Sequence, residues 1–201
     1  KEKIKYATFR VDAKDLSVIN ILEEEGFRVV DGYLILVKEL GKERQRDIGI
    51  KIRGARFADI KKLQEDIGPT FIYSRFFNDP LISKNSAVKM HKIWIENCIR
   101  GKAAEKVYVA EMNKQVIGFI AVEINGNEGH IPLIGISPKY RGRKISQELT
   151  LYAINNWFTK KRAKSVKIET QITNIPAIRA YENLGFRITD SALTLRWTQK
   201  T

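Results

Sequence analysis

Two strand-to-helix transitions in the second half of the chain limit most strongly what it can fold into. In the first, residues 130–136 (His-Ile-Pro-Leu-Ile-Gly-Ile) form an apolar run between turn signals, which predicts a buried strand. Pro132 cannot donate to a strand ladder, so we expect an edge or a bulge there, with backbone groups free to pair with an extended ligand. The chain then turns into a helical pattern in which Leu149, Ala153 and Trp157 follow at four-residue steps.

The turn between this strand and this helix is basic. Lys139, Arg141, Arg143 and Lys144 surround Gly142. The first turn of a helix leaves several amide N–H groups without an intrahelical partner, and the helix dipole adds positive potential there. Such amides and arginines suit a pyrophosphate, although a solvated basic turn would have the same composition.

The second transition leads into a helix with clear start and stop signals. Asn174 can cap its start, Pro176 lies in its first turn, and Gly185 can end it. Tyr181 is then either a core residue of the apolar helix face or a donor of its hydroxyl to a reacting group.

Together, the two segments resemble the acetyl-CoA site of the GNAT superfamily of N-acetyltransferases, and the resemblance covers residues 47–201. The family's Arg/Gln-x-x-Gly-x-Gly/Ala loop, whose amides hold the CoA pyrophosphate, matches residues 141–146, with Lys144 and Ser146 where small residues are usual. The resemblance implies acetyl-CoA as cosubstrate and no metal. The cofactor-binding residues that it implies are Ile134, Gly135, Ile136, Arg141, Gly142, Arg143, Lys144, Ile145, Ser146 and Asn174.

The resemblance also implies direct acetyl transfer to an amine, with Tyr181 assisting the CoA thiolate. A tyrosine has a pKa near 10 and a thiol near 8.5, so full proton transfer is uphill by about 2 kcal/mol, whereas a hydrogen bond needs no change of the tyrosine pKa. The amine must also lose a proton, and no base is clear from the sequence. His130, which begins the key strand, and Glu123, which ends the preceding strand, are the candidates, directly or through water.

The order of predicted elements indicates an α/β fold with a GNAT-type mixed central sheet flanked by helices. Strands follow one another in the middle of the chain and alternate with helices towards its end. The expected strands cover residues 48–52, 107–110, 116–124, 130–136, 166–172 and a last stretch ending at Trp197. The expected helices cover residues 57–67, 86–99, the stretch from the basic turn to Lys160, and the Tyr181 segment.

The N-terminus repeats the plan of the C-terminal end. Residues 7–37 align without a gap on residues 166–196, at an offset of 159, so that Gly26-Phe-Arg faces Gly185-Phe-Arg. We expect strand, helix, Gly-Phe and strand in both. Convergence of two such units by chance is the alternative.

This repeat suggests a division of the chain into two parts. We interpret residues 1–46 as a degenerate half of the GNAT fold and residues 47–201 as the GNAT domain. Because Leu22 stands opposite Tyr181, the N-terminal copy should have no CoA site.

Two stretches carry a narrower resemblance, to GNAT enzymes that acetylate TDP-fucosamine, a TDP-linked 4-amino-4,6-dideoxygalactose of surface polysaccharide synthesis. They are Ser-Arg-Phe-Phe-Asn-Asp-Pro at residues 74–80 and Trp-Ile-Glu-Asn-Cys-Ile-Arg-Gly at residues 94–101. The resemblance implies a TDP-amino sugar as acceptor, with the position of the amine left open. Arg75 could pair with its diphosphate, and Phe76 or Phe77 could stack on the thymine or the sugar, unless both rings anchor the loop in the core.

The net charge of +13 fits anionic nucleotide ligands as well as it fits nucleic acid. No helix-turn-helix, zinc or RNA-binding motif accompanies the charge, so a nucleic-acid-binding domain is a distant alternative. An acetyltransferase of protein N-terminal or lysine amines and a non-catalytic CoA-binding module are the others.

The single cysteine, Cys98, excludes a disulfide within the chain and favours a reducing compartment. The sequence has no signal peptide pattern and no apolar run of membrane-spanning length, so we expect a cytoplasmic protein without a membrane partner. The oligomeric state is open, a homodimer included. Because the chain begins with Lys1, whether a segment precedes it is open too.

Overall fold

The computed structural model describes residues 4–41 and 48–199. Within these residues, one eight-stranded sheet runs in the order β1-β8-β2-β7-β6-β5-β4-β3. All neighbouring strands are antiparallel except β6 and β7, which are parallel. The strands are β1 (Tyr6–Asp12), β2 (Arg28–Glu39), β3 (Lys51–Gly54), β4 (Lys106–Met112), β5 (Gln115–Asn125), β6 (Glu128–Ile136), β7 (Ser165–Gln171) and β8 (Arg187–Thr198).

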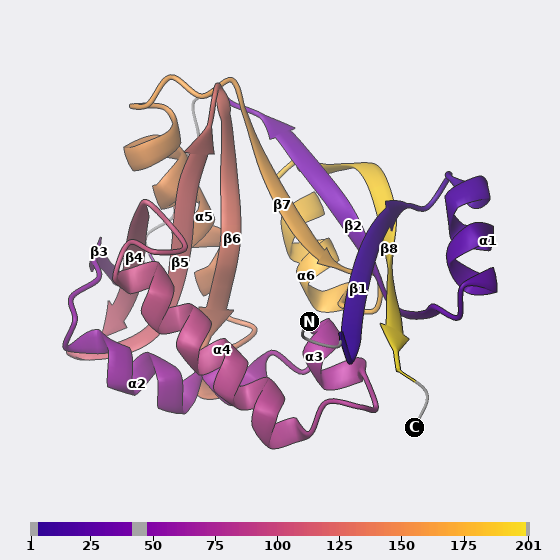
Figure 1. The fold of residues 1–201 in the computed structure, drawn as a ribbon. Coiled ribbons are helices and arrows are strands. Elements are labelled where there is room, and N and C mark those ends of the chain that lie inside the picture. The colour runs from indigo at the N-terminus through magenta and orange to yellow at the C-terminus, as the bar shows by residue number, and fades with distance from the viewer. Residues whose placement is uncertain (1–3, 42–47, 200–201) are drawn as a thin grey trace.

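Helices cover both faces of this sheet (Figure 1). The helices are α1 (Leu16–Glu24), α2 (Asp59–Asp66), α3 (Arg75–Asn78), α4 (Lys84–Ile99), α5 (Ile145–Ala153) and α6 (Ile175–Glu182), with short 3-10 turns η1 (Gly68–Thr70) and η2 (Pro138–Tyr140) and a π-helical turn η3 (Ile154–Phe158). The fold is therefore α/β with a mixed sheet, as the sequence predicted.

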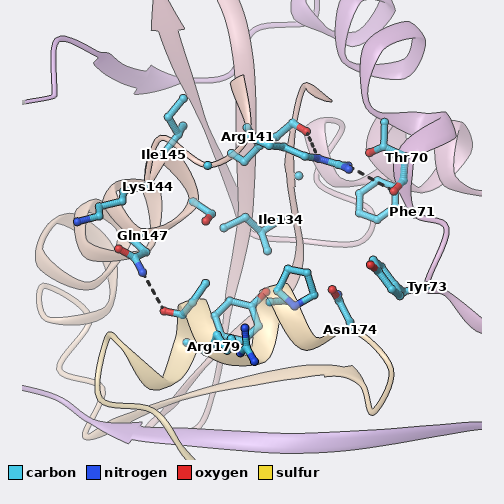
Figure 2. Close-up of a pocket in the computed structure, with 18 of the residues that line it drawn as sticks. Thr70, Phe71, Tyr73, Ile134, Arg141, Lys144, Ile145, Gln147, Asn174 and Arg179 are labelled. Atoms are coloured by element: carbon cyan, nitrogen blue, oxygen red, sulfur yellow. Dashed lines mark hydrogen bonds between the residues drawn. The ribbon is translucent and has the colours of Figure 1, made fainter. Parts of the chain in front are cut away.

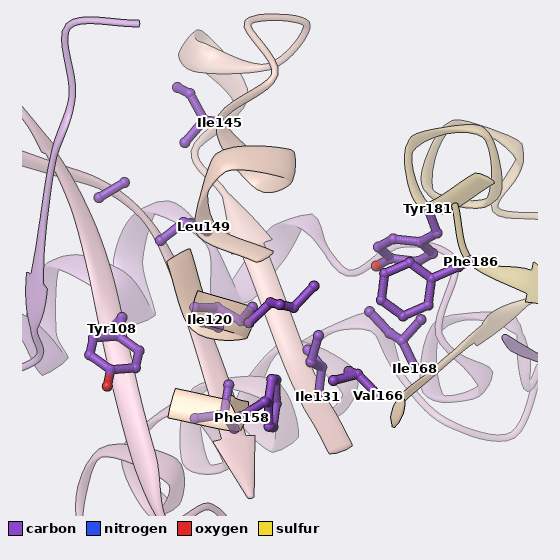
Figure 3. Close-up of a cluster of buried hydrophobic side chains, with 14 of the residues drawn as sticks. Tyr108, Ile120, Ile131, Ile145, Leu149, Phe158, Val166, Ile168, Tyr181 and Phe186 are labelled. Atoms are coloured by element: carbon purple, nitrogen blue, oxygen red, sulfur yellow. The ribbon is translucent and has the colours of Figure 1, made fainter. Parts of the chain in front are cut away.

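Strand β5 shows how the two layers form. Successive side chains of a strand point to opposite faces. Phe119 packs with the helices α2 and α4, whereas its neighbour Ile120 packs with α5 on the other side. Both side chains are fully buried. Figure 3 shows the α5 side of this core, where Leu149 lies near Ile120 and a second group of side chains reaches Tyr181 and Phe186.

The N-terminal strand β2 lies between β7 and β8, inside the sheet (Figure 1). Strand β1 in turn pairs with β8 at the edge. The N-terminal unit, β1-α1-β2, is therefore part of the same sheet as the rest of the chain. The boundary expected between residues 46 and 47 lies outside the described residues.

The N-terminal unit and the C-terminal unit, β7-α6-β8, pair with each other as symmetric partners. Ala7 pairs with Trp197, and adding the offset of 159 to 7 and subtracting it from 197 gives the pair Val166 and Lys38, which is also observed. All seven β1–β8 pairs map onto the seven β2–β7 pairs in this way. The register shifts of the β2–β8 ladder, after Val29 and after Ile35, obey the same relation.

Both units also end their helix in the same way. Gly26 and Gly185 each have φ of +86°, a conformation that glycine adopts without steric cost. The amide of the next residue then donates to a helix carbonyl, Phe27 to Leu22 and Phe186 to Tyr181. The expected order of strand, helix, Gly-Phe and strand is present in both units.

Three boundaries differ from the expected ones. The strand expected from residue 48 begins at Lys51, because Gly49 has φ of +70°, which is incompatible with an extended strand. The helix expected to reach Lys160 is α-helical only to Ala153 and continues as the π-helical turn. The expected 74–80 loop contains the single-turn helix α3.

Candidate functional site

The first cavity opens where β6 and β7 diverge. Their parallel pairing runs from Glu128 and Ser165 to Ile131 and Ile168, and the ladder ends just before Pro132. The β5–β6 ladder shifts register at the same place, so the expected bulge is present. Beyond it, residues 134–136 line a cavity of about 560 Å³ on the β7 side of β6.

The basic turn forms one wall of this cavity (Figure 2). Gly142 and Lys144 have φ of +76° and +60°, and α5 begins at the next residue, Ile145. A lysine in the left-handed region is unusual, since the conformation costs an L-residue about 1–2 kcal/mol. Lys144 occupies the position where the family loop has glycine, so the backbone keeps the glycine conformation although the residue has changed.

Arginine side chains of this turn behave differently. Arg141 lines the cavity and donates to the carbonyl oxygens of Ile136 at 3.4 Å and Thr70 at 3.5 Å. It therefore links the turn to β6 and to η1. Arg143 is not among the described lining residues, and its guanidinium lies over the Tyr140 ring at 5.6 Å.

Helix α6 forms the opposite wall. Asn174 occupies the N-cap position, but its side chain makes no cap hydrogen bond. Its amide instead donates to Thr170 Oγ1 at 3.0 Å, and Figure 2 shows the side chain pointing towards the cavity. The amide oxygen of Asn174 is therefore not used in capping.

Tyr181 also lines the cavity and is only 6% exposed. Burial raises the pKa of the Tyr181 phenol well above its usual range. The hydroxyl consequently stays protonated at any working pH, and it can donate a hydrogen bond but not readily lose its proton.

A second cavity, of about 460 Å³, lies beside the first. Its described lining residues are Arg10, Ser74, Arg75, Phe76, Met90, Ile93, Trp94, Asn97 and Gln171. Arg75 and Phe76 therefore lie in one cavity, with the guanidinium 4.5 Å from the centroid of the ring. Phe77 lines neither cavity.

Phe77 instead belongs to an aromatic cluster around His91, which is 1% exposed. Phe71 stacks on the His91 ring at 4.8 Å, and Phe76, Phe77 and Trp94 surround it at 5.8–6.1 Å. Burial lowers the pKa of His91, so its ring is neutral near pH 7. The cluster holds α3 against α4 and thereby fixes one wall of the second cavity.

The two cavities meet at Ser74 and Gln171, which line both. The Ser74 hydroxyl oxygen is buried and has no hydrogen-bond partner. Gln171 donates from Nε2 to Asp31 Oδ2 at 3.3 Å. Asp31 is 8% exposed, and desolvation raises the pKa of its carboxyl group. Polar groups with unused hydrogen-bonding capacity thus lie where two ligands could touch.

His130 and Glu123 pair with each other, Nδ1 to Oε1 at 2.8 Å, and line neither cavity. His130 lies four residues before Ile134 on β6, about 13 Å away along an extended strand. The structure therefore does not bring these two candidate bases to the junction of the cavities.

The remaining candidates from the sequence come together as expected. The first cavity is lined by Ile134, Gly135, Ile136, Arg141, Gly142, Lys144, Ile145, Ser146, Asn174 and Tyr181. The sequence reasoning missed Arg10, Asp31 and Gln171, because nothing in their local pattern indicates that β1, β2 and β7 adjoin the acceptor side.

Two further properties concern metals and membranes. Within the described residues, no group of three or more His, Cys, Asp or Glu side chains could hold a metal ion. None of the helices in the same residues combines the length and the apolarity needed to cross a membrane.

Comparison with known families gives one match that covers more than half of the chain. The model described as "Acetyltransferase (GNAT) family" matches residues 71–186. This range contains both walls of the first cavity.

Two curated relatives are similar in sequence. The spore coat polysaccharide biosynthesis protein SpsD of Bacillus subtilis is 32% identical over 128 residues, which are 64% of this chain and 44% of that protein. The dTDP-fucosamine acetyltransferase of Escherichia coli is 24% identical over 188 residues, which are 92% of this chain and 79% of that protein. The chain thus spans less than half the length of the first relative.

Solved structures share the fold at low identity. The PaiA N-acetyltransferase of Thermoplasma acidophilum, solved in complex with coenzyme A, has a TM-score of 0.59 and 20% identity, covering 76% of this chain and 100% of its own. A tandem GNAT protein from the clavulanic acid biosynthesis pathway has a TM-score of 0.65 and 12% identity, covering 98% of this chain and 65% of its own.

Proposed function

Because the chain belongs to the GNAT family of acetyltransferases, we propose that it transfers an acetyl group from acetyl-CoA to the primary amine of a TDP-linked amino-dideoxy sugar. The observation that carries the proposal is the pair of adjoining cavities. One has the turn, the open strand and the tyrosine that acetyl-CoA requires, and the other has an arginine beside aromatic rings. They share Ser74 and Gln171, where acetyl group and amine would meet.

The first cavity fits acetyl-CoA by its backbone. Amides at the start of α5, with the nearby Arg141 and Lys144, suit the pyrophosphate. The stretch 134–136 of β6 is not paired with β7 and can bond an extended pantetheine chain as an added strand would. Asn174 supplies an amide oxygen on the opposite wall.

Tyr181 acts on the departing sulfur by donating a hydrogen bond. Its raised pKa disfavours full proton transfer but keeps the O–H in place as charge develops on the thiolate. A donor in a buried site stabilises such charge more strongly than it would in water.

The amine needs a proton acceptor before it attacks the thioester carbonyl. Asp31 reaches the junction through Gln171, and its raised pKa makes it a stronger base than an ordinary carboxylate. This position suits proton transfer better than that of the His130–Glu123 pair, which lines neither cavity.

The nucleotide-sugar acceptor is supported by the relatives and by the second cavity. One relative is named for TDP-fucosamine acetylation and one for spore coat polysaccharide biosynthesis. Arg75 can pair with the acceptor diphosphate, and Phe76 offers a ring for stacking. Phe77 takes no direct part, because it packs on His91 instead.

The N-terminal unit is a degenerate half of the GNAT fold that has lost its own CoA site. Its strand registers follow those of the C-terminal unit. The position of Tyr181 is taken by Leu22, which packs in the small α1 core. The similarity of 98% of the chain to a tandem GNAT protein agrees with this origin.

The test is CoA thiol release with acetyl-CoA and a panel of TDP-4-amino and TDP-3-amino dideoxy sugars, with a peptide amine as control. We expect turnover with at least one sugar and none with the peptide. Turnover with the peptide alone would overturn the sugar acceptor, and no turnover with any sugar, while acetyl-CoA still raises the melting temperature, would do the same.

A matched pair of variants tests the role of Arg75. Arg75→Ala should raise the acceptor KM by about tenfold or more and leave the acetyl-CoA KM unchanged, since a charge-assisted contact contributes about 1.5–3 kcal/mol. Arg187→Ala, an exposed arginine of β8 that lines neither cavity, should change neither KM. Equal changes of both KM values in Arg75→Ala would exclude the proposed role.

A further inference from the structure

We infer that Arg10 and Arg75 together form a phosphate-binding clamp in the second cavity, so that the N-terminal unit supplies half of the acceptor's anion site. The inference deepens the proposed function, since it rests on the second cavity being the acceptor site. It adds a residue from a part of the chain that has no CoA site, and it names the chemical group which that residue recognises.

The first support is position. Thr8 and Arg10 are two residues apart on β1 and therefore project from the same face of the sheet, about 7 Å apart. Arg75, which comes from α3, donates from Nη1 to Thr8 Oγ1 at 3.3 Å. Both guanidinium groups thus lie over the same stretch of β1, and both line the second cavity.

The second support is orientation. The Arg10 guanidinium lies over the Tyr33 ring at 3.9 Å, and that of Arg75 lies over the Phe76 ring at 4.5 Å. Stacking on an aromatic face fixes the plane of a guanidinium and leaves the N–H groups on its edge available. Two such planar donors suit the oxygens of a phosphate or diphosphate.

The third support is charge. The described lining residues include two arginines and no carboxylate. Glu169 is the acid nearest to Arg10 among the recorded ion pairs, but the distance is 3.8 Å and the same carboxylate also lies 4.0 Å from Lys167. Asp31 is buried beneath the cavity and accepts from Gln171. The cavity therefore keeps a positive charge that an anion can neutralise.

The fourth support is the apolar wall opposite the arginines. Met90 and Ile93 of α4 are 39% and 46% exposed, although both are large apolar side chains, and Trp94 lies beside them in the lining. Arginines on one side and apolar and aromatic side chains on the other match a ligand with phosphate groups and a flat ring, which is the chemistry of a nucleoside diphosphate.

Binding of thymidine diphosphate, inorganic pyrophosphate and thymidine, measured by calorimetry with CoA at saturation, tests the clamp. Saturating CoA fills the first cavity, so the titrated nucleotide can report only on another site. We expect thymidine diphosphate to bind the wild-type protein more tightly than pyrophosphate or thymidine does. Arg10→Ala should weaken it by about tenfold or more, Arg10→Lys by less, and Arg187→Ala not at all.

Two results would overturn the inference. One is an unchanged affinity for thymidine diphosphate in Arg10→Ala, and the other is an equal loss of CoA affinity in that variant, which would indicate a general disturbance of the fold. Arg10→Lys keeps the charge and guards against a folding defect, and the melting temperature of each variant is measured alongside.

The outcome separates the clamp from the proposed function. Turnover of a TDP-amino sugar with normal KM in Arg10→Ala would keep the function and remove the clamp. Loss of nucleotide binding in Arg10→Ala, together with no turnover of any amino sugar, would keep the clamp and require a different phosphorylated amine as acceptor.

Discussion

At the scale of single residues, Lys144 shows how a loop can keep its conformation after its sequence has changed. Its φ of +60° suits glycine, and the lysine holds it at a cost of about 1–2 kcal/mol. We expect Lys144→Gly to be more stable than Lys144→Ala by about 1 kcal/mol, because both remove the charge and only glycine removes the strain.

This difference would appear as a melting temperature higher by about 2–4 °C in Lys144→Gly than in Lys144→Ala, measured without CoA. Equal melting temperatures would mean that the turn relaxes and that the left-handed conformation is not required. Affinity for CoA in the two variants then reports the contribution of the lysine charge, which both have lost.

Tyr181 is the residue on which the chemistry depends most directly. Tyr181→Phe removes only the hydroxyl of a ring that is 6% exposed, so the packing against Phe186 should survive. We expect kcat to fall by about 10²-fold or more, with acetyl-CoA affinity changed by less than about threefold. A folded Tyr181→Phe protein that retains full kcat in the CoA-release assay would exclude Tyr181 from the mechanism.

At the scale of secondary-structure elements, a buried ion pair joins the acceptor side to the N-terminal unit. Asp79, which follows α3 and is 2% exposed, accepts from Arg196 of β8 and from the Tyr6 hydroxyl of β1 at 3.0 Å. The carboxylate thus fixes the end of α3, and with it Arg75, against two strands that are distant in the sequence.

Removal of this carboxylate should be strongly destabilising. We expect Asp79→Ala to lower the free energy of unfolding by about 3–5 kcal/mol in urea, because Arg196 would be left buried without its partner. As a control, Asp66→Ala removes the exposed pair with Lys62 and should cost less than about 1 kcal/mol. Similar costs for the two variants would show that Asp79 does not hold the elements together.

At the scale of the whole molecule, the N-terminal unit is a structural part of the sheet. Strand β2 hydrogen-bonds to both β7 and β8, and its Leu36 is fully buried in the main core. We expect the fragment 48–201 to be unfolded or aggregated, since removal of β2 exposes two strand edges and opens the core. Circular dichroism and CoA binding would measure this.

The control for that experiment is a full-length protein with a protease site inserted between residues 41 and 48. After cleavage it should stay folded and bind CoA, because every strand pairing is retained. A fragment 48–201 that folds and binds CoA alone would contradict the structural role of β2.

Local sequence signals predicted the elements better than their ends. The Gly-Phe stops and Asn174 mark α1 and α6 at almost their observed bounds, because helix termination is decided by a few neighbouring residues. The π-helical turn after Ala153 was not predicted, since the four-residue apolar spacing continues through it. The helix α3 was missed because one turn is too short to show a period.

The sequence by itself determined the family, the CoA turn and the tyrosine, because each depends on residues that are close together in the chain. It also indicated the internal repeat. Only the tertiary structure decided that β2 lies between β7 and β8 and that Arg10, Asp31 and Gln171 adjoin the acceptor cavity. The physical reason is that sheet order and cavity lining depend on contacts between distant segments, which a local pattern of hydrophobicity or charge does not specify.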